Sequence, residues 1–245
     1  ALMSLSFILL CIASMQPQWG EQTRLVETRT LDILLLQDVS QSMLAQDVKP
    51  SRLLRSQHEI SYFIDHLEGD RIGLMAFGAS TRLLCPMTQD YNALKMFLKE
   101  LDPTMVLQGT DVALAIQKGL SRFSEESIQS KLIVLLSDGE EHDPQAIEIA
   151  KEAARRGIKI YTVGIGSLSG VKIPDPRRPG KWKKDGKGQE IKTRLNEKVL
   201  VEIAEITGAE YFHASQGGFQ LTRILDAIRE MERDSLGESE VVEYE

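Results

Sequence analysis

The chain has 245 residues, 42% of them hydrophobic and 27% charged, which is long enough for one large α/β domain or two small ones. Its net charge of −7 at pH 7 argues against nucleic acid as a partner, because phosphate binding requires a basic surface. Two cysteines are too few for a disulfide framework.

The N-terminal segment is uncharged over its first 20 residues and, as a helix, would span about 30 Å, the thickness of a bilayer core. We therefore expect residues 1–20 to form a membrane helix, with Trp19 as its interfacial anchor. No Met opens the chain, so we expect this helix to be truncated. A trimmed signal peptide, whose basic start would be missing, and a buried helix ended by Pro17 are the alternatives.

After a linker at residues 21–29, apolar runs alternate with stretches of helical spacing. The predicted strands, in chain order, are residues 31–36, 71–77, 81–84, 131–136, 158–164 and 209–213. The predicted helices are residues 51–67, 91–101, 111–123, 144–156, 196–206 and 219–231. The first run is continuously apolar, as in a central strand buried on both faces, and residues 81–84 suit an antiparallel edge. This order predicts an α/β fold with a doubly wound, mostly parallel six-stranded sheet.

Residues 167–193 interrupt this alternation. They are rich in Gly, Pro, Lys and Arg, and a turn signal at residues 184–188 (KDGKG) lies between Trp182 and Ile191. We expect an inserted surface β-hairpin here, with its basic side chains in solvent.

Polar residues follow two of the predicted strands and open one helix. Residues 38–42 (DVSQS) follow the first strand, residues 137–139 (SDG) follow the fourth, and residues 109–111 (GTD) precede a helix. Each segment alone is typical of an ordinary turn or helix cap. Ligands of open α/β sheets bind outside the carboxyl ends of the strands, so one crevice could gather all three segments.

Together the three segments resemble the metal-ion-dependent adhesion site of von Willebrand A domains, over about residues 30–231. The resemblance implies a Rossmann-like fold whose first and fourth strands are neighbours, which brings Asp38 and Asp138 together. It implies that Ser40 and Ser42 bind the ion through their hydroxyls, Thr110 directly or through water, and both aspartates largely through water. The implied ion is Mg²⁺, with Mn²⁺ or Ca²⁺ as alternatives, and the implied ligand is an acidic side chain of a partner protein.

A second metal cluster, a zinc site and catalysis have weaker support in the sequence. Residues 140–143 (EEHD) suit the start of a helix, whose dipole favours acids, with a second metal cluster as the alternative. Asp111 also suits a helix start, and the four histidines show no zinc spacing. No histidine lies near the 38–42 motif, and no glycine-rich phosphate loop follows a strand. We therefore expect a binding module and not an enzyme.

Three segments resemble one group of proteins that carry von Willebrand A domains. Residues 16–20 (QPQWG), the hairpin and residues 207–212 (TGAEYF) are similar to the membrane-anchored proteins of bacterial aerotolerance (Bat) operons. This similarity implies that the protein is located in the bacterial inner membrane, with an extracytoplasmic domain at residues 30–232. It also implies that the protein works with other Bat-type proteins and a MoxR-type AAA+ ATPase. Those proteins usually carry a second membrane helix, toward which the acidic tail at residues 233–245 would lead. A non-catalytic subunit of an ATP-driven metal chelatase is the alternative, disfavoured by the N-terminal membrane segment.

Overall fold

The computed structural model describes residues 30–124, 129–140, 144–214, 221 and 223–230. Its main sheet has six strands in the order β3-β2-β1-β4-β5-β8, all parallel except β3. The strands are β1 (Asp32–Asp38), β2 (Arg71–Phe77), β3 (Thr81–Thr88), β4 (Lys131–Ser137), β5 (Lys159–Ile165) and β8 (Tyr211–Ala214). The predicted fold class, with its antiparallel edge and the first and fourth strands side by side, is confirmed.

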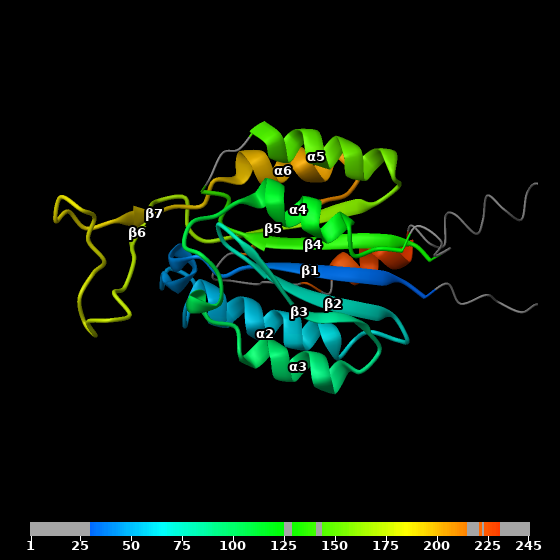
Figure 1. Ribbon diagram of the computed structural model, residues 1–245, viewed down its shortest axis with the longest axis horizontal. Coiled ribbons are helices and arrows are strands. Elements are labelled where there is room, and N and C mark those ends of the chain that lie inside the picture. Colours follow the sequence, from blue (N-terminus) through cyan, green and yellow to red (C-terminus); the bar gives the residue numbers. More distant parts are fainter. Residues whose placement is uncertain (1–29, 125–128, 141–143, 215–220, 222, 231–245) are drawn as a thin grey trace, which may run out of the picture.

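Helices cover both faces of the sheet (Figure 1). One face carries α4 (Val112–Leu120), α5 (Pro144–Arg155) and α6 (Glu197–Ile206), and the other carries α2 (Arg52–Ile64), α3 (Tyr91–Lys99) and the helical residues 223–230. Short 3₁₀ turns form at η1 (Gln41–Leu44) and η2 (Pro103–Met105). Because side chains alternate along a strand, β1 feeds both apolar cores: Ile33 and Leu35 join one, Leu34 and Leu36 the other.

The central strand β1 determines where the polar motif lies. All seven of its residues are buried, and it pairs in parallel with both β2 and β4. Asp38 is opposite Phe77 of β2, and Gln37 is opposite Leu136 of β4, so the three strands end at one edge of the sheet. The motif that follows β1 therefore lies at the carboxyl edge, where parallel α/β sheets bind ligands.

Most predicted elements end within three residues of their observed bounds, but the edge strand and the hairpin differ more. The edge strand was expected at residues 81–84, but β3 continues to Thr88, with register shifts against β2 between Ile72 and Met75. It carries Pro86, which an edge strand tolerates because proline lacks an N–H and the outer side of an edge strand has no neighbouring strand to which it would donate. The inserted hairpin is present, but its regular pairing is confined to β6 (Val171–Lys172) and β7 (Lys192–Thr193), with bridges beyond.

Both ends of the described domain lie away from the carboxyl edge. The amide of Leu31 donates to Asp70 Oδ1 at 2.9 Å, and Arg229 Nη2 donates to the carbonyl of His66 at 3.2 Å. The loop between α2 and β2 thus contacts both ends, whereas the hairpin projects from the opposite side (Figure 1). The predicted membrane segment and acidic tail lie outside the described residues, and none of the helices that are described could span a bilayer.

Candidate metal centre

The aspartate and both serines of the 38–42 motif are brought together. The Oδ1 atom of Asp38 accepts the backbone N–H of Ser40 at 2.8 Å, and its Oδ2 atom accepts the hydroxyl of Ser137 at 2.7 Å. The tight η1 turn, in which Met43 N–H donates to the carbonyl of Ser40, returns the chain so that the Ser40 and Ser42 Oγ atoms are 2.8 Å apart. Three oxygen-bearing side chains therefore converge just beyond β1.

Asp38 is an electrostatically unfavourable carboxylate. Burial, together with the negative charge of Asp138 on the neighbouring strand end, raises the pKa of Asp38 to about 7. Hydrogen bonds from Ser137 and Ser40 oppose that shift. Asp38 forms no ion pair with any described residue. A buried anion in this position would be stabilised by a cation.

Thr110 is held at the same edge by its neighbours. The amide of Asp111 donates to the carbonyl of Gly78, just after β2, and Ala79 N–H donates to the carbonyl of Leu107, both at 2.9 Å. The loops approach so closely that a Cβ on Gly78 would lie 2.7 Å from that Leu107 oxygen. Asp111 itself caps α4 by accepting the N–H of Leu114 at 2.7 Å, the helix-start role expected for it.

A cleft of about 950 Å³ extends from Thr110 toward the base of the hairpin. It is lined by Gly109, Thr110, Glu140, Leu168, Arg194, Leu195, Asn196, Glu197 and Lys198. The Glu140 carboxylate is engaged here, since it accepts the N–H of Arg194 at 2.9 Å. The other members of the alternative cluster, residues 141–143, lie outside the described residues. Within the described part of the chain, no group of three or more His, Cys, Asp or Glu could hold a metal.

Sequence reasoning missed Arg52, which lies beneath this site with its side chain fully buried. Its Nη1 atom donates to Asp138 Oδ2 at 2.8 Å and to Thr193 Oγ1 at 2.9 Å. Its Nε and Nη2 atoms donate to the two oxygens of Asp47 at 2.9 and 2.8 Å. An arginine in the first turn of an amphipathic helix is ordinarily solvated, so no pattern in the sequence indicated this role.

Arg52 forms buried ion pairs with two carboxylates, those of Asp47 and Asp138. Burial alone would raise the pKa of Asp47, but the hydrogen bonds and charge of Arg52 hold that pKa below its ordinary value. Asp47 Oδ2 also accepts the N–H of Ser167 at 2.7 Å. Gly166 lies directly against the guanidinium with a φ of +140°, and a Cβ there would be 2.7 Å from the Arg52 Cζ atom. Arg52 thus joins the η1–α2 loop, the end of β4 and the base of the hairpin.

The arrangement suits a hard divalent cation. Two neutral hydroxyls and a buried carboxylate without a cationic partner are oxygen donors of the kind that Mg²⁺ prefers, since it retains several waters and needs few protein ligands. The second carboxylate, Asp138, is already partly neutralised by Arg52.

Known proteins share this framework. The model of the von Willebrand factor type A domain matches residues 33–141. An aerotolerance-related membrane protein from Bacteroides fragilis is 34% identical, with a TM-score of 0.73 over 76% of this chain and 92% of that one. The protein BatB from Bacteroides thetaiotaomicron is 33% identical, with a TM-score of 0.75 over 83% of this chain and 98% of that one.

Further comparisons show how much of its relatives' length this chain covers and how far the likeness to more distant structures extends. A UPF0353 protein from Nocardia farcinica is 29% identical over 94% of this chain and 70% of its own length. A protein from Borreliella burgdorferi is 30% identical over 74% of this chain and 53% of its own length, so this chain spans only part of the length of both relatives. Proximal thread matrix protein 1 from the mussel byssus, with zinc in its MIDAS motif, is 14% identical with a TM-score of 0.59 over 81% of this chain and 44% of that one. At that identity the likeness shows the fold alone.

Proposed function

This chain belongs to the von Willebrand factor type A domain family and is related to the Bat-type aerotolerance proteins, and from this premise we propose that it is a metal-dependent, non-catalytic protein-binding module. It binds a divalent cation at the carboxyl edge of the sheet and, through that cation, an acidic side chain of a partner protein.

The residues proposed to hold the ion are Ser40 and Ser42 through their hydroxyls, Thr110 directly or through water, and Asp38 and Asp138 through water. The observation that carries this proposal is the buried Asp38 carboxylate beside two hydroxyls 2.8 Å apart. Bound Mg²⁺ would be the cationic partner that the Asp38 carboxylate lacks. Because its direct ligands would be neutral hydroxyls, the ion would keep enough positive charge to bind a carboxylate of a partner protein. Mn²⁺ or Ca²⁺ could substitute for it, because both also prefer oxygen ligands.

Titration calorimetry with Mg²⁺ tests the metal site. The variant carrying Ser40→Ala and Ser42→Ala should lose Mg²⁺ binding, because it lacks both hydroxyl ligands. Ser56→Ala is the matched control, since Ser56 is also buried but donates to the carbonyl of Leu53 within α2. Undiminished Mg²⁺ binding by the double variant would refute the site.

The cellular setting is a second part of the proposal. The uncharged first 20 residues and the likeness to a protein described as a membrane protein support a membrane anchor. We propose that this anchor lies in the inner membrane with the domain outside the cytoplasm, as the resemblance to the Bat-type proteins implies. Other Bat-type proteins and a MoxR-type ATPase are the proposed partners. A pull-down from detergent-solubilised membranes, with Mg²⁺ or EDTA, should capture a partner only with Mg²⁺. Equal capture in EDTA would argue against metal-dependent binding.

A further inference from the structure

The inserted hairpin, residues 167–193, differs in charge from the rest of the protein. It contains eight basic and three acidic residues, a net charge of +5, so the remaining residues of the chain carry −12. Two of its basic residues form ion pairs within the hairpin, Lys172 with Glu190 and Arg178 with Asp175. Five others are exposed and form no ion pair with any described residue: Arg177, Lys181, Lys184, Lys187 and Lys192.

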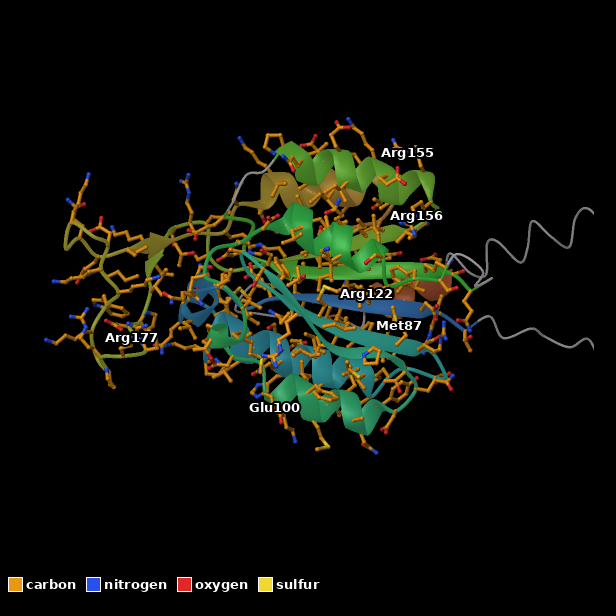
Figure 2. The ribbon with its side chains drawn as sticks, in the orientation of Figure 1. Met87, Glu100, Arg122, Arg155, Arg156 and Arg177 are labelled. Carbon is orange, nitrogen blue, oxygen red and sulfur yellow. The ribbon has the colours of Figure 1, made fainter. Side chains whose placement is uncertain are left out.

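These charges are carried on a defined structure. Asp185 closes the tip by accepting the N–H groups of Lys187 and Gln189, both at 2.8 Å. Backbone bridges join Pro174 to Trp182 and Lys184 to Glu190 along its length. Figure 2 shows side chains, including that of Arg177, extending from the hairpin into solvent at the end of the molecule. A structured arm presents its charges without the full ordering cost of a flexible loop.

The base of the hairpin is bonded to the candidate metal centre. Thr193 accepts a hydrogen bond from Arg52 Nη1 at 2.9 Å, and that same nitrogen donates to Asp138. Ser167 donates its N–H to Asp47, the other partner of Arg52. The cleft that begins at Thr110 continues past residues at the base of the hairpin. A polypeptide lying in this cleft could reach the metal centre and the basic side chains together.

We propose that the basic hairpin is a second contact surface for the partner, and that it selects an extended acidic segment in which one carboxylate binds the metal centre and neighbouring carboxylates face the hairpin. This rests on the proposed function, because the central carboxylate needs the metal. Charge complementarity favours an acidic peptide over a bilayer, since the charge of −12 on the rest of the chain would repel an extended anionic surface.

The test uses the full chain and two fluorescein-labelled peptides, each with one central glutamate flanked either by glutamates or by glutamines. In Mg²⁺ and low salt, the glutamate-flanked peptide should bind about tenfold more tightly, as expected for several weak exposed charge pairs acting together, and high salt should remove this preference. The hairpin variant replaces four exposed basic residues with Gln: Arg177, Lys181, Lys184 and Lys187. The control variant makes the same charge change outside the hairpin, at the exposed residues Lys99, Lys118, Arg122 and Arg155 (Arg122 and Arg155 are labelled in Figure 2).

The hairpin variant should lose the preference for flanking glutamates and still bind the glutamine-flanked peptide with Mg²⁺, while the control variant should keep the preference. A preference that persists in the hairpin variant would overturn the proposal. The proposal would also be overturned if the protein did not discriminate between the peptides and the hairpin instead mediated binding to phosphatidylglycerol vesicles. Self-association that depends on the hairpin in sedimentation, again without discrimination between the peptides, would overturn it as well. If the glutamine-flanked peptide binds equally in Mg²⁺ and EDTA, the proposed metal function has failed, and the two-part contact fails with it.

Discussion

Replacing Arg52 with Met should destabilise the domain more than any single change at an exposed ion pair. The substitution removes a fully buried guanidinium and leaves the Asp47 and Asp138 carboxylates without their cation. Breaking a buried ion pair from one side costs about 3–5 kcal/mol. The lower part of that range applies, because Asp47 keeps the N–H of Ser167 at 2.7 Å and Asp138 keeps weaker contacts, with Thr193 at 3.4 Å and with the N–H of Glu140 at 3.3 Å. In a domain of this size the melting temperature should fall by roughly 6–15 °C.

Urea unfolding followed by circular dichroism, in EDTA and in excess Mg²⁺, would measure this loss. If the proposed metal binds, Mg²⁺ should recover part of the lost free energy, because it places a cation near Asp138 again. Arg71→Met is the control, since Arg71 pairs with Asp32 at the opposite end of β1 and its effect should be the same in EDTA and in Mg²⁺. A loss below about 1 kcal/mol for Arg52→Met, the contribution of an exposed pair, would refute the reasoning.

Four further outcomes are expected. Asp38→Ala should abolish the Mg²⁺-induced rise in melting temperature and leave the melting temperature in EDTA unchanged or higher; a surviving Mg²⁺ effect would contradict the site. The raised pKa of Asp38 means that its contribution to apo stability is present below pH 3.8 and is lost as pH rises to about 7, so Asp38→Asn should flatten stability over that interval in urea titrations. Gly166→Ala should destabilise the fold by about 1–3 kcal/mol, because its positive φ and the adjacent guanidinium leave no room for a methyl group; a neutral melt would count against this. Residues 30–232 expressed alone should give a cooperative melt with helical and strand signals, and a disordered spectrum would defeat the domain assignment.

The sheet could be predicted because its central strands are largely apolar and are separated by stretches of helical spacing. β2 was predicted with its observed bounds, Arg71–Phe77. The prediction for β4 ended one residue too early, at residue 136 instead of Ser137. β3 was underestimated because Cys85 and Pro86 interrupt the pattern of a strand, and only pairing with β2 explains their place. The helix predicted from residue 196 begins at Glu197. Asn196 precedes it without a capping hydrogen bond from its side chain, and its N–H donates to the carbonyl of Asp138.

The oxygen-bearing residues of the candidate site could be found because they follow strands that end at one edge. The network beneath them could not. Arg52, Asp47 and Thr193 are separated by up to 146 residues, and each suits an unremarkable helix start, loop or hairpin base. These residues form hydrogen bonds only because the fold brings the base of the hairpin over the first turn of α2. Local sequence patterns do not indicate this contact.

The contact of both domain ends with the loop between α2 and β2 bears on how the protein would carry mechanical load. Tension between its two ends would enter and leave on one side of the domain and would act first on the helical residues 223–230, which pack on the face of the sheet. The length of β1, about 23 Å for its seven residues, separates that side from Asp38. A pull on the ends would therefore act on the last described helix before it reached the carboxyl edge, where the proposed metal centre lies.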